Sequence, residues 1–158
     1  EGYAARYGVL YPLQTFSKGR EVSFDVIPIF LEANTKKDAD YLKKIASALS
    51  ENVRFMSSEK RRSLHLAAVF ACNFTNHIYA LSYKLLEQEE IPADVLLPLI
   101  DETTAKIHAM PPAAAQTGPA IRYDENVINK HLAMLDDPDM KEIYQLLSRS
   151  IHKEAQNE

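Results

Sequence analysis

The chain is poor in glycine. Its 158 residues include only four, Gly2, Gly8, Gly19 and Gly118, and no two of them have the spacing of the motif G-x-G-x-x-G. In dinucleotide-binding sheets these glycines let the backbone approach a pyrophosphate closely. The sequence therefore lacks the phosphate-binding turn of such a sheet.

Cysteine, histidine pairs and basic clusters are also scarce. The single cysteine, Cys72, excludes an internal disulfide, and its neighbours Phe70 and Phe74 predict a buried thiol in a reducing compartment. The five histidines are widely spaced, with no pair four residues apart, so we expect no metal site. The 18 basic and 22 acidic residues are spread along the chain, which argues against a nucleic-acid partner.

Long apolar runs are absent as well. None approaches the roughly 20 residues that a membrane-spanning helix needs, so we expect no membrane partner. The first residues, Glu1-Gly2-Tyr3, lack Met and the basic-then-apolar order of a signal peptide. We therefore expect a cytoplasmic protein, and we expect Glu1 to mark a boundary made by processing or by the choice of fragment.

The first third of the chain has the pattern of the closing strands of a nucleotide-binding α/β sheet. Strands are predicted over Tyr7 to Leu13, Val26 to Ala33 and Val53 to Met56, with Pro28 near the start of the second. A helix is predicted over Thr35 to Ser50, with Thr35 and Asp38 resembling a capping box. Strand, helix and strand at this spacing form a crossover that places its two strands in parallel.

Everything after Ser57 has a helical pattern, so domains are predicted at 1–57 and 58–158. The first helix, Glu59 to about Glu89, is apolar all round and is expected to be buried centrally. Three more helices are predicted: one from Pro92 to Met110 with a kink at Pro98, one from Asp124 to Leu135, and one from Asp137 to about Lys153. A connector of residues 113–123 precedes the helix that begins at Asp124.

Polar side chains on the long helix are candidates for a site. At about 100° per residue, one line carries His65, Cys72, Asn76 and Tyr83, with Asn73 about 80° away from His65. Because unpaired buried polar groups are costly, these groups either bond one another in the core or face a cleft. The sequence leaves both alternatives open.

The connector offers a second candidate. Its polar segment Gln116-Thr117-Gly118-Pro119 is followed by Arg122, whose planar guanidinium can hold a carboxylate or phosphate with two hydrogen bonds. The structural alternative is that Asp124 is a helix cap with Arg122 paired to it at the surface. The charge runs Lys60 to Arg62 and Glu87 to Glu90 are interpreted as solvated helix ends.

Three segments together resemble a known family. Tyr11 to Ser17 (YPLQTFS), His65 to Asn73 (HLAAVFACN) and Thr117-Gly118-Pro119 with Arg122 and Asp124 are similar to the C-terminal domain of an uncharacterised bacterial family of Rossmann-like NADP oxidoreductases. The family's relatives in fold are 6-phosphogluconate dehydrogenase, the beta-hydroxyacid dehydrogenases and pyrroline-5-carboxylate reductase. Family members often have His where this chain has Tyr11, so no proton-transfer role is assigned to Tyr11.

The resemblance implies a fold and a function. It implies an α/β remnant, the closing strands of a Rossmann-like sheet, followed by an all-α domain of the 6-phosphogluconate dehydrogenase C-terminal type. It also implies an upstream cofactor domain and a homodimer formed around the long helix. The function implied is that of the substrate-binding and dimerisation half of an NADP-dependent oxidoreductase acting on a small carbonyl or hydroxy compound. A non-catalytic helical dimerisation or ligand-sensing module is the alternative.

Site residues follow from the same resemblance. His65 and Asn73 would be catalytic. The related dehydrogenases use a Lys in the equivalent long helix as acid or base, and since this chain has no Lys between Lys60 and Lys84, the resemblance implies that His65 takes that role. Substrate-binding residues would be Thr117, Gly118, Arg122 and Asp124, contributed from the same or the partner subunit. Cofactor-binding residues would be Pro12, Gln14 and Thr15.

Overall fold

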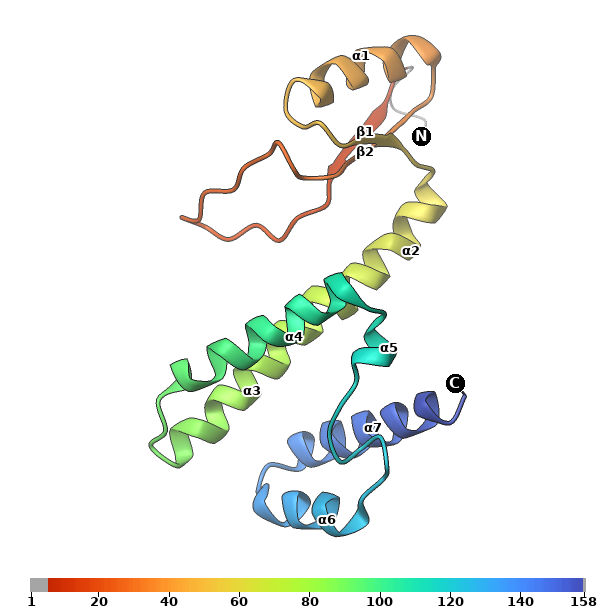
Figure 1. The fold of residues 1–158 in the computed structure, drawn as a ribbon. Helices are drawn as coiled ribbons and strands as arrows, with labels where there is room; N and C mark the ends of the chain where they lie inside the picture. Colours follow the sequence, from red (N-terminus) through yellow and green to blue (C-terminus); the bar gives the residue numbers. More distant parts are fainter. Residues whose placement is uncertain (1–5, 158) are drawn as a thin grey trace. The chain divides into compact units, whose positions relative to one another are not determined.

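The computed structural model describes residues 6–157, which form two compact units divided between Ile78 and Tyr79 (Figure 1). The predicted domain boundary at 57/58 lies where the last strand ends and the long helix begins, ahead of this division. As a functional boundary it stays a prediction.

The first unit contains a three-stranded sheet with one helix, α1, lying across it (Figure 1). Central strand β2 pairs antiparallel with β1 and parallel with β3. The expected sequence of strand, strand, helix and strand is confirmed, with Pro28 directly before β2. The elements are β1 (Gly8–Pro12), β2 (Ile29–Ala33), α1 (Lys36–Ser47) and β3 (Val53–Phe55).

The core of this unit lies between β2 and α1. Ile29, Leu31 and Ala46 have no solvent exposure, and burial of a side chain as large as Ile or Leu contributes about 1.5 to 3 kcal/mol. Gly8 sits where α1 approaches β1, since a Cβ atom there would lie 2.6 Å from the Leu42 side chain and 2.9 Å from the Glu32 carbonyl oxygen. Glycine at this position permits the close packing of helix on strand.

The start of α1 is held by the predicted cap. Thr35 Oγ1 accepts a hydrogen bond from the Asp38 backbone N–H at 3.1 Å and donates to Asp38 Oδ2 at 2.7 Å. Arg6 pairs with the other Asp38 oxygen, its Nε at 2.7 Å. Arg6 first and Thr35 second lower the pKa of the Asp38 carboxyl by bonding its ionised form.

The predicted long helix is present but irregular. It consists of α2 (Ser58–Ala68), a π-helical segment η1 (Val69–Phe74) and α3 (Thr75–Gln88). The straight-helix alignment of His65, Cys72, Asn76 and Tyr83 is therefore wrong. An inserted residue in a π-helical turn rotates everything after it by about one residue, or about 100°.

The expectation that this helix is buried centrally is also wrong for the described part of the chain. None of its residues is buried in α2, η1 or α3. Leu66, Phe70 and Phe74 are 60%, 63% and 51% exposed, and Cys72 is an exposed thiol rather than a buried one. The physical reason is that the helix has more apolar surface than the other described elements of the chain cover.

The second unit is helical throughout its described residues, which confirms an α/β portion followed by a helical one. A 3₁₀ turn leads into α4, and Pro98 lies in the first turn of α4, where its missing N–H costs nothing. The predicted kink is thus replaced by a helix start. The elements are η2 (Ala93–Leu96), α4 (Leu97–Ala109), α5 (Pro112–Ala115), α6 (Glu125–Met134) and α7 (Pro138–Ala155).

Caps fix the ends of these helices as predicted. Asp124 accepts from the Val127 N–H at 3.2 Å to start α6, and Asp137 accepts from the Asp139 N–H at 3.0 Å to start α7. Lys84 Nζ lies 3.1 Å from Asp137 Oδ2 and is the largest cause of the lowered pKa of that carboxyl. One short helix, α5, was not predicted and occupies the beginning of the expected connector.

The C-terminus of α3 has a Schellman motif. Ile91 N–H donates to the Leu86 carbonyl at 2.9 Å and Glu90 N–H donates to the Glu87 carbonyl at 3.2 Å. Glu90 has φ of 55°, the left-handed conformation that usually falls to glycine in this motif. Within residues 6–157, no helix is long and apolar enough to cross a membrane.

Candidate functional site

A polar cluster attaches the start of α2 to the sheet. Ser58 Oγ donates to Glu32 Oε2 at 2.6 Å, and Arg61 Nη1 donates to the same oxygen at 2.9 Å. Arg61 Nη2 also donates to Ser58 Oγ at 3.0 Å. Because Glu32 belongs to β2, these bonds fix the first turns of α2 against the central strand.

The electrostatics of this cluster favour a charged Glu32. The hydrogen bond from Ser58 is the largest cause of its lowered pKa, and the hydrogen bond from Arg61 is the next. The Arg61 side chain is only 16% exposed. Arg61 therefore has a structural role: its charge is neutralised by the ion pair with Glu32.

A pocket of about 360 Å³ opens beside this attachment. Tyr11 of β1 lines it on the strand side, and its other residues come from one face of α2 and from Val69 at the start of η1. Tyr11 Oη lies 3.2 Å from His65 Nδ1, which joins the strand to the helix across the pocket. The lining residues are Tyr11, Ser58, Arg61, Arg62, His65, Leu66 and Val69.

The pocket has the components for proton transfer next to a cationic group. Imidazole is the side chain that gains and loses a proton most readily near neutral pH, and a hydroxyl partner on one ring nitrogen orients the other. The structure thus places the predicted catalytic residue His65 in a pocket rather than in a buried network. This favours the cleft alternative for His65.

Of the seven lining residues, only His65 was predicted as a site residue. Tyr11 was given no proton-transfer role, and Arg61 and Arg62 were interpreted as a solvated helix end. One signal was available: Ser58, Arg62, His65 and Val69 follow at spacings of four, three and four residues, which is one face of a helix. The contact of this face with Tyr11 depends on how α2 meets the sheet, which no spacing reveals.

Asn73 does not line this pocket. It lies in the π-helical segment η1 and is exposed. Thr75 Oγ1 donates to the Phe70 carbonyl at 3.1 Å, five residues back, which supports the wide turn. π-Helical segments often occur at functional sites, so the catalytic role of Asn73 stays a prediction without a partner in the pocket.

The predicted cofactor-binding residues follow β1 directly. Pro12 is the last residue of that strand, paired with Ile29 of β2. Gln14 and Thr15 lie in the exposed loop after it, where Gln14 Oε1 accepts from the Thr15 N–H at 2.8 Å. Pro12 is the sequence neighbour of Tyr11, but Pro12, Gln14 and Thr15 are not among the residues that line the pocket.

The four predicted substrate-binding residues lie in the second unit. Gly118 has φ of 103° with no atom within 4 Å of where a Cβ would be, and Thr117 and Arg122 are exposed. Asp124 is the cap of α6, which confirms the structural part of its alternative interpretation. Among the described residues, however, no ion pair joins Arg122 to Asp124.

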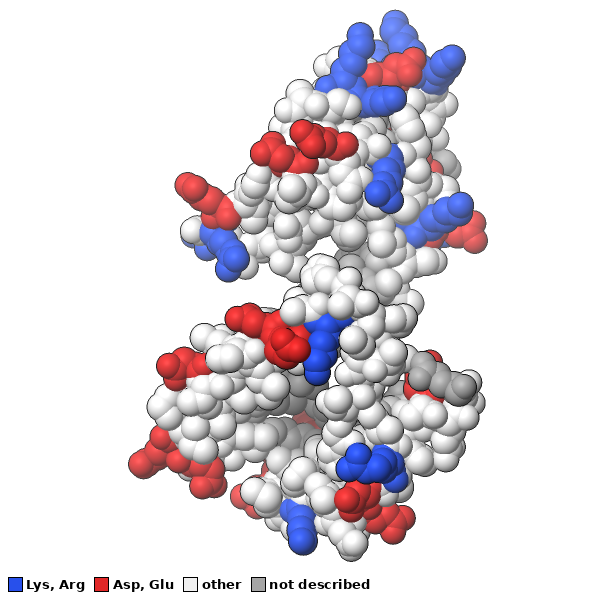
Figure 2. All heavy atoms as spheres, viewed as in Figure 1, with Lys and Arg blue, Asp and Glu red and all other residues white. Residues whose placement is uncertain are grey.

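Surface charge gives little further direction. Figure 2 shows Lys and Arg at the end of the first unit that carries α1, with Asp and Glu among them. Side chains of residues 6–157 form no group of three or more metal-ligating residues. The pocket lined by Tyr11 and His65 is the candidate site, because it contains a residue that the sequence predicts to be catalytic.

Known proteins resemble the chain over most of its length. Residues 27–151 match the family described as Domain of unknown function (DUF2520). A crystal structure described as that of "putative NADP oxidoreductase BF3122" from Bacteroides fragilis is 62% identical, with a TM-score of 0.95 over 97% of this chain and 60% of that one. No match was found among curated proteins.

A second solved structure shows the fold alone. Protein TM1727 from Thermotoga maritima is 24% identical, with a TM-score of 0.72 over 95% of this chain and 62% of that one. The chain thus spans about three fifths of each of these two proteins.

Proposed function

Since this chain belongs to the DUF2520 family, and since it is 62% identical to the Bacteroides fragilis protein, we propose that it is the substrate-binding and dimerisation half of an NADP-dependent oxidoreductase. The substrate is a small carbonyl or hydroxy compound. The helical part is proposed to be of the 6-phosphogluconate dehydrogenase C-terminal type.

The observation that carries the proposal is the Tyr11 to His65 hydrogen bond in the wall of the pocket. Interconversion of a carbonyl and a hydroxyl requires a proton at oxygen as well as a hydride at carbon. His65 gives or takes that proton, and Tyr11 holds the imidazole in place through Nδ1. The other ring nitrogen, Nε2, is then the atom that meets the substrate oxygen.

The described residues do not themselves fit a whole dinucleotide. The glycine-rich turn that holds a pyrophosphate is absent from them, and Gly8 is used for the packing of α1 on β1. NADP supplies or accepts the hydride in enzymes of this class. The contribution of this chain is the proton and the binding of the substrate, with Pro12, Gln14 and Thr15 as proposed contacts to the cofactor.

Assembly is the second part of the proposal. Phe70 and Phe74 form an apolar face of the long helix that is exposed in the single chain and does not line the pocket. A second copy of the chain covers this face in the proposed homodimer. Thr117, Gly118, Arg122 and Asp124 are proposed as further substrate-binding residues, contributed by the same or the partner subunit.

The experiment replaces His65 in the complete protein that contains this chain. We expect His65→Gln to lower turnover with NADP by about 10²-fold or more, the range for loss of a general acid or base. The melting temperature should change little, because His65 is exposed. Tyr11→Phe should lower turnover less and alter its pH profile.

The matched control is His131→Gln. His131 is also exposed and also meets a tyrosine, with Nδ1 2.8 Å from Tyr144 Oη, but it lies outside the pocket. Normal turnover of the His65 variant would refute the proposed role. Absence of NADP binding and of hydride transfer across a substrate panel would instead support the alternative, a non-catalytic dimerisation or ligand-sensing module.

A further inference from the structure

The two neighbouring arginines of the pocket are in different states. Arg61 is occupied by Glu32 and Ser58, as described above. Arg62, the next residue, is exposed and forms no ion pair within the described part of the chain. None of the described residues that line the pocket is a carboxylate. Among these lining residues, Arg62 is therefore a permanent positive charge that no ion pair of the described residues neutralises.

The position of this charge limits what it can bind. Arg62 and His65 are three residues apart on α2, and side chains at this spacing are neighbours with Cβ atoms about 5 to 6 Å apart. Tyr11 Oη is 3.2 Å from the His65 ring. A small ligand whose anionic group is held by Arg62 can therefore place a neighbouring oxygen atom against His65 or Tyr11.

A carboxylate fits this geometry better than a cofactor phosphate. In a hydroxy or oxo acid the carboxylate lies one or two carbons from the hydroxyl or carbonyl carbon, so one short molecule can meet two neighbouring side chains of the same helix face. A nicotinamide dinucleotide has a ribose between its reacting ring and its nearest phosphate. The guanidinium fork matches a carboxylate with two parallel hydrogen bonds, and Leu66 and Val69 supply an apolar wall for a short carbon chain.

We propose that this pocket binds short hydroxy or oxo acids, with the carboxylate on Arg62 and the hydroxyl or carbonyl oxygen on the Tyr11 and His65 pair. The proposal rests on the proposed function, and it names the substrate class of the same site. Arg62 is the specificity-determining residue, and Arg61 is its structural neighbour.

The test measures binding without cofactor, so it does not depend on turnover. Lactate and 3-hydroxybutyrate are titrated into the complete protein while the His65 ring signals are followed by NMR, and their neutral amides and inorganic phosphate serve as comparisons. We expect at least one acid to bind at least about tenfold more tightly than its amide, as loss of a charged hydrogen-bonding partner predicts.

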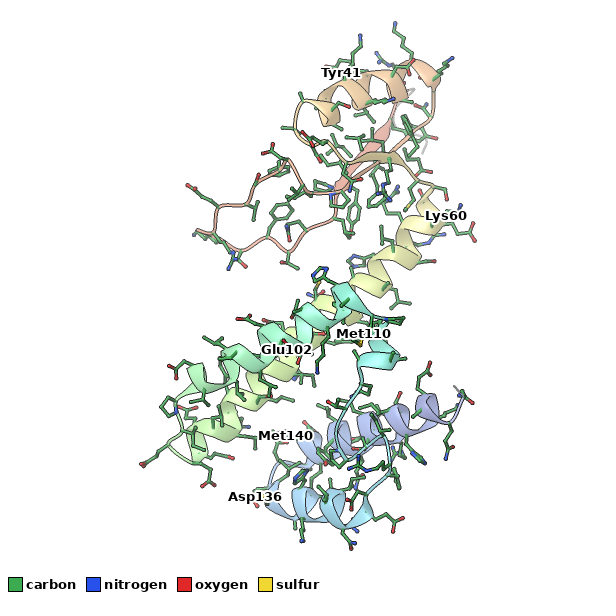
Figure 3. The ribbon with its side chains drawn as sticks, viewed as in Figure 1. Tyr41, Lys60, Glu102, Met110, Asp136 and Met140 are labelled. Atoms are coloured by element: carbon green, nitrogen blue, oxygen red, sulfur yellow. The ribbon has the colours of Figure 1, made fainter. Side chains whose placement is uncertain are left out.

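Variants assign this preference to one side chain. Arg62→Gln should abolish the preference, and Arg62→Lys should retain only part of it, because an ammonium group lacks the fork. The matched control is Lys60→Gln, which removes the same charge two residues away; Lys60, labelled at the start of α2 in Figure 3, does not line the pocket. The control should keep the wild-type preference.

The outcomes separate the two proposals. Equal binding of acid and amide, or a preference that survives Arg62→Gln, overturns the assignment of Arg62. Tight binding of phosphate and NADPH through Arg62 with no binding of the acids also overturns it and makes the pocket a cofactor-phosphate site. Binding of an acid through Arg62 in a protein that shows no hydride transfer supports the carboxylate site and refutes the oxidoreductase.

Discussion

Replacement of Phe70 should dissociate the proposed homodimer. Phe70 is 63% exposed in the single chain and packs edge to face on Phe74, with ring centroids 5.0 Å apart. A fully buried phenylalanine removes about 150 to 250 Å² from water. The exposed part of Phe70 therefore offers about 130 Å² to a partner, worth about 3 kcal/mol at 25 cal/mol per Å².

A twofold interface uses this side chain twice, once from each copy. Burial of both copies would contribute about 6 kcal/mol as an upper bound, since interface burial is incomplete. If half of this is realised, Phe70→Gln weakens the dimer by about 3 kcal/mol, or roughly 100-fold in Kd. Gln keeps good helix propensity, so the long helix itself should persist.

The assay is analytical ultracentrifugation of the wild-type and variant chains over a range of micromolar concentrations. The matched control is Tyr41→Gln, because Tyr41 is an aromatic residue on α1 with nearly the same exposure, 61% (Figure 3). We expect a shift to the 17.9 kDa monomer for Phe70→Gln only. A wild-type chain that sediments as a monomer, or a Phe70 variant that remains a dimer at the wild-type concentrations, would refute the reasoning.

Three further predictions concern stability and cofactor binding. Glu90→Gly should raise the melting temperature in calorimetry by roughly 3 °C, because glycine adopts the left-handed conformation without strain and a gain of about 1 kcal/mol gives this shift in a chain of this size. Glu90→Gln removes only the charge and should give less than half of this shift. The pKa of Glu32 in the folded protein lies below its ordinary 4.5, so the stability that its hydrogen bonds supply is present above pH 4.5 and is lost as the pH falls through the folded pKa. Glu32→Gln should therefore flatten the acid side of a plot of melting temperature against pH, and an unchanged slope would contradict this. The 158-residue chain should not bind NADP tightly, since it lacks the glycine turn, and micromolar binding in calorimetry would show that other residues hold the pyrophosphate.

Local patterns were sufficient to predict most elements of this fold. The caps at Thr35, Asp124 and Asp137 all form, because a side chain that accepts from a backbone N–H two or three residues later needs no distant partner. The strands and the crossover helix were likewise predicted from apolar periodicity and proline positions. Such signals depend mainly on neighbours along the chain, so the sequence pattern alone was enough to find these elements.

Tertiary structure decided the rest. The π-helical turn at Val69–Phe74 broke the predicted alignment of polar residues, because helical spacing assumes 3.6 residues per turn throughout. His65 was a candidate from its sequence context, but its partner Tyr11 lies 54 residues earlier and meets it only where Glu32 and Arg61 fix α2 to the sheet. The difference between an occupied Arg61 and an uncompensated Arg62 has the same origin. Sequence determines which side chains can act, whereas long-range packing determines which of them share a pocket and which charges remain unneutralised.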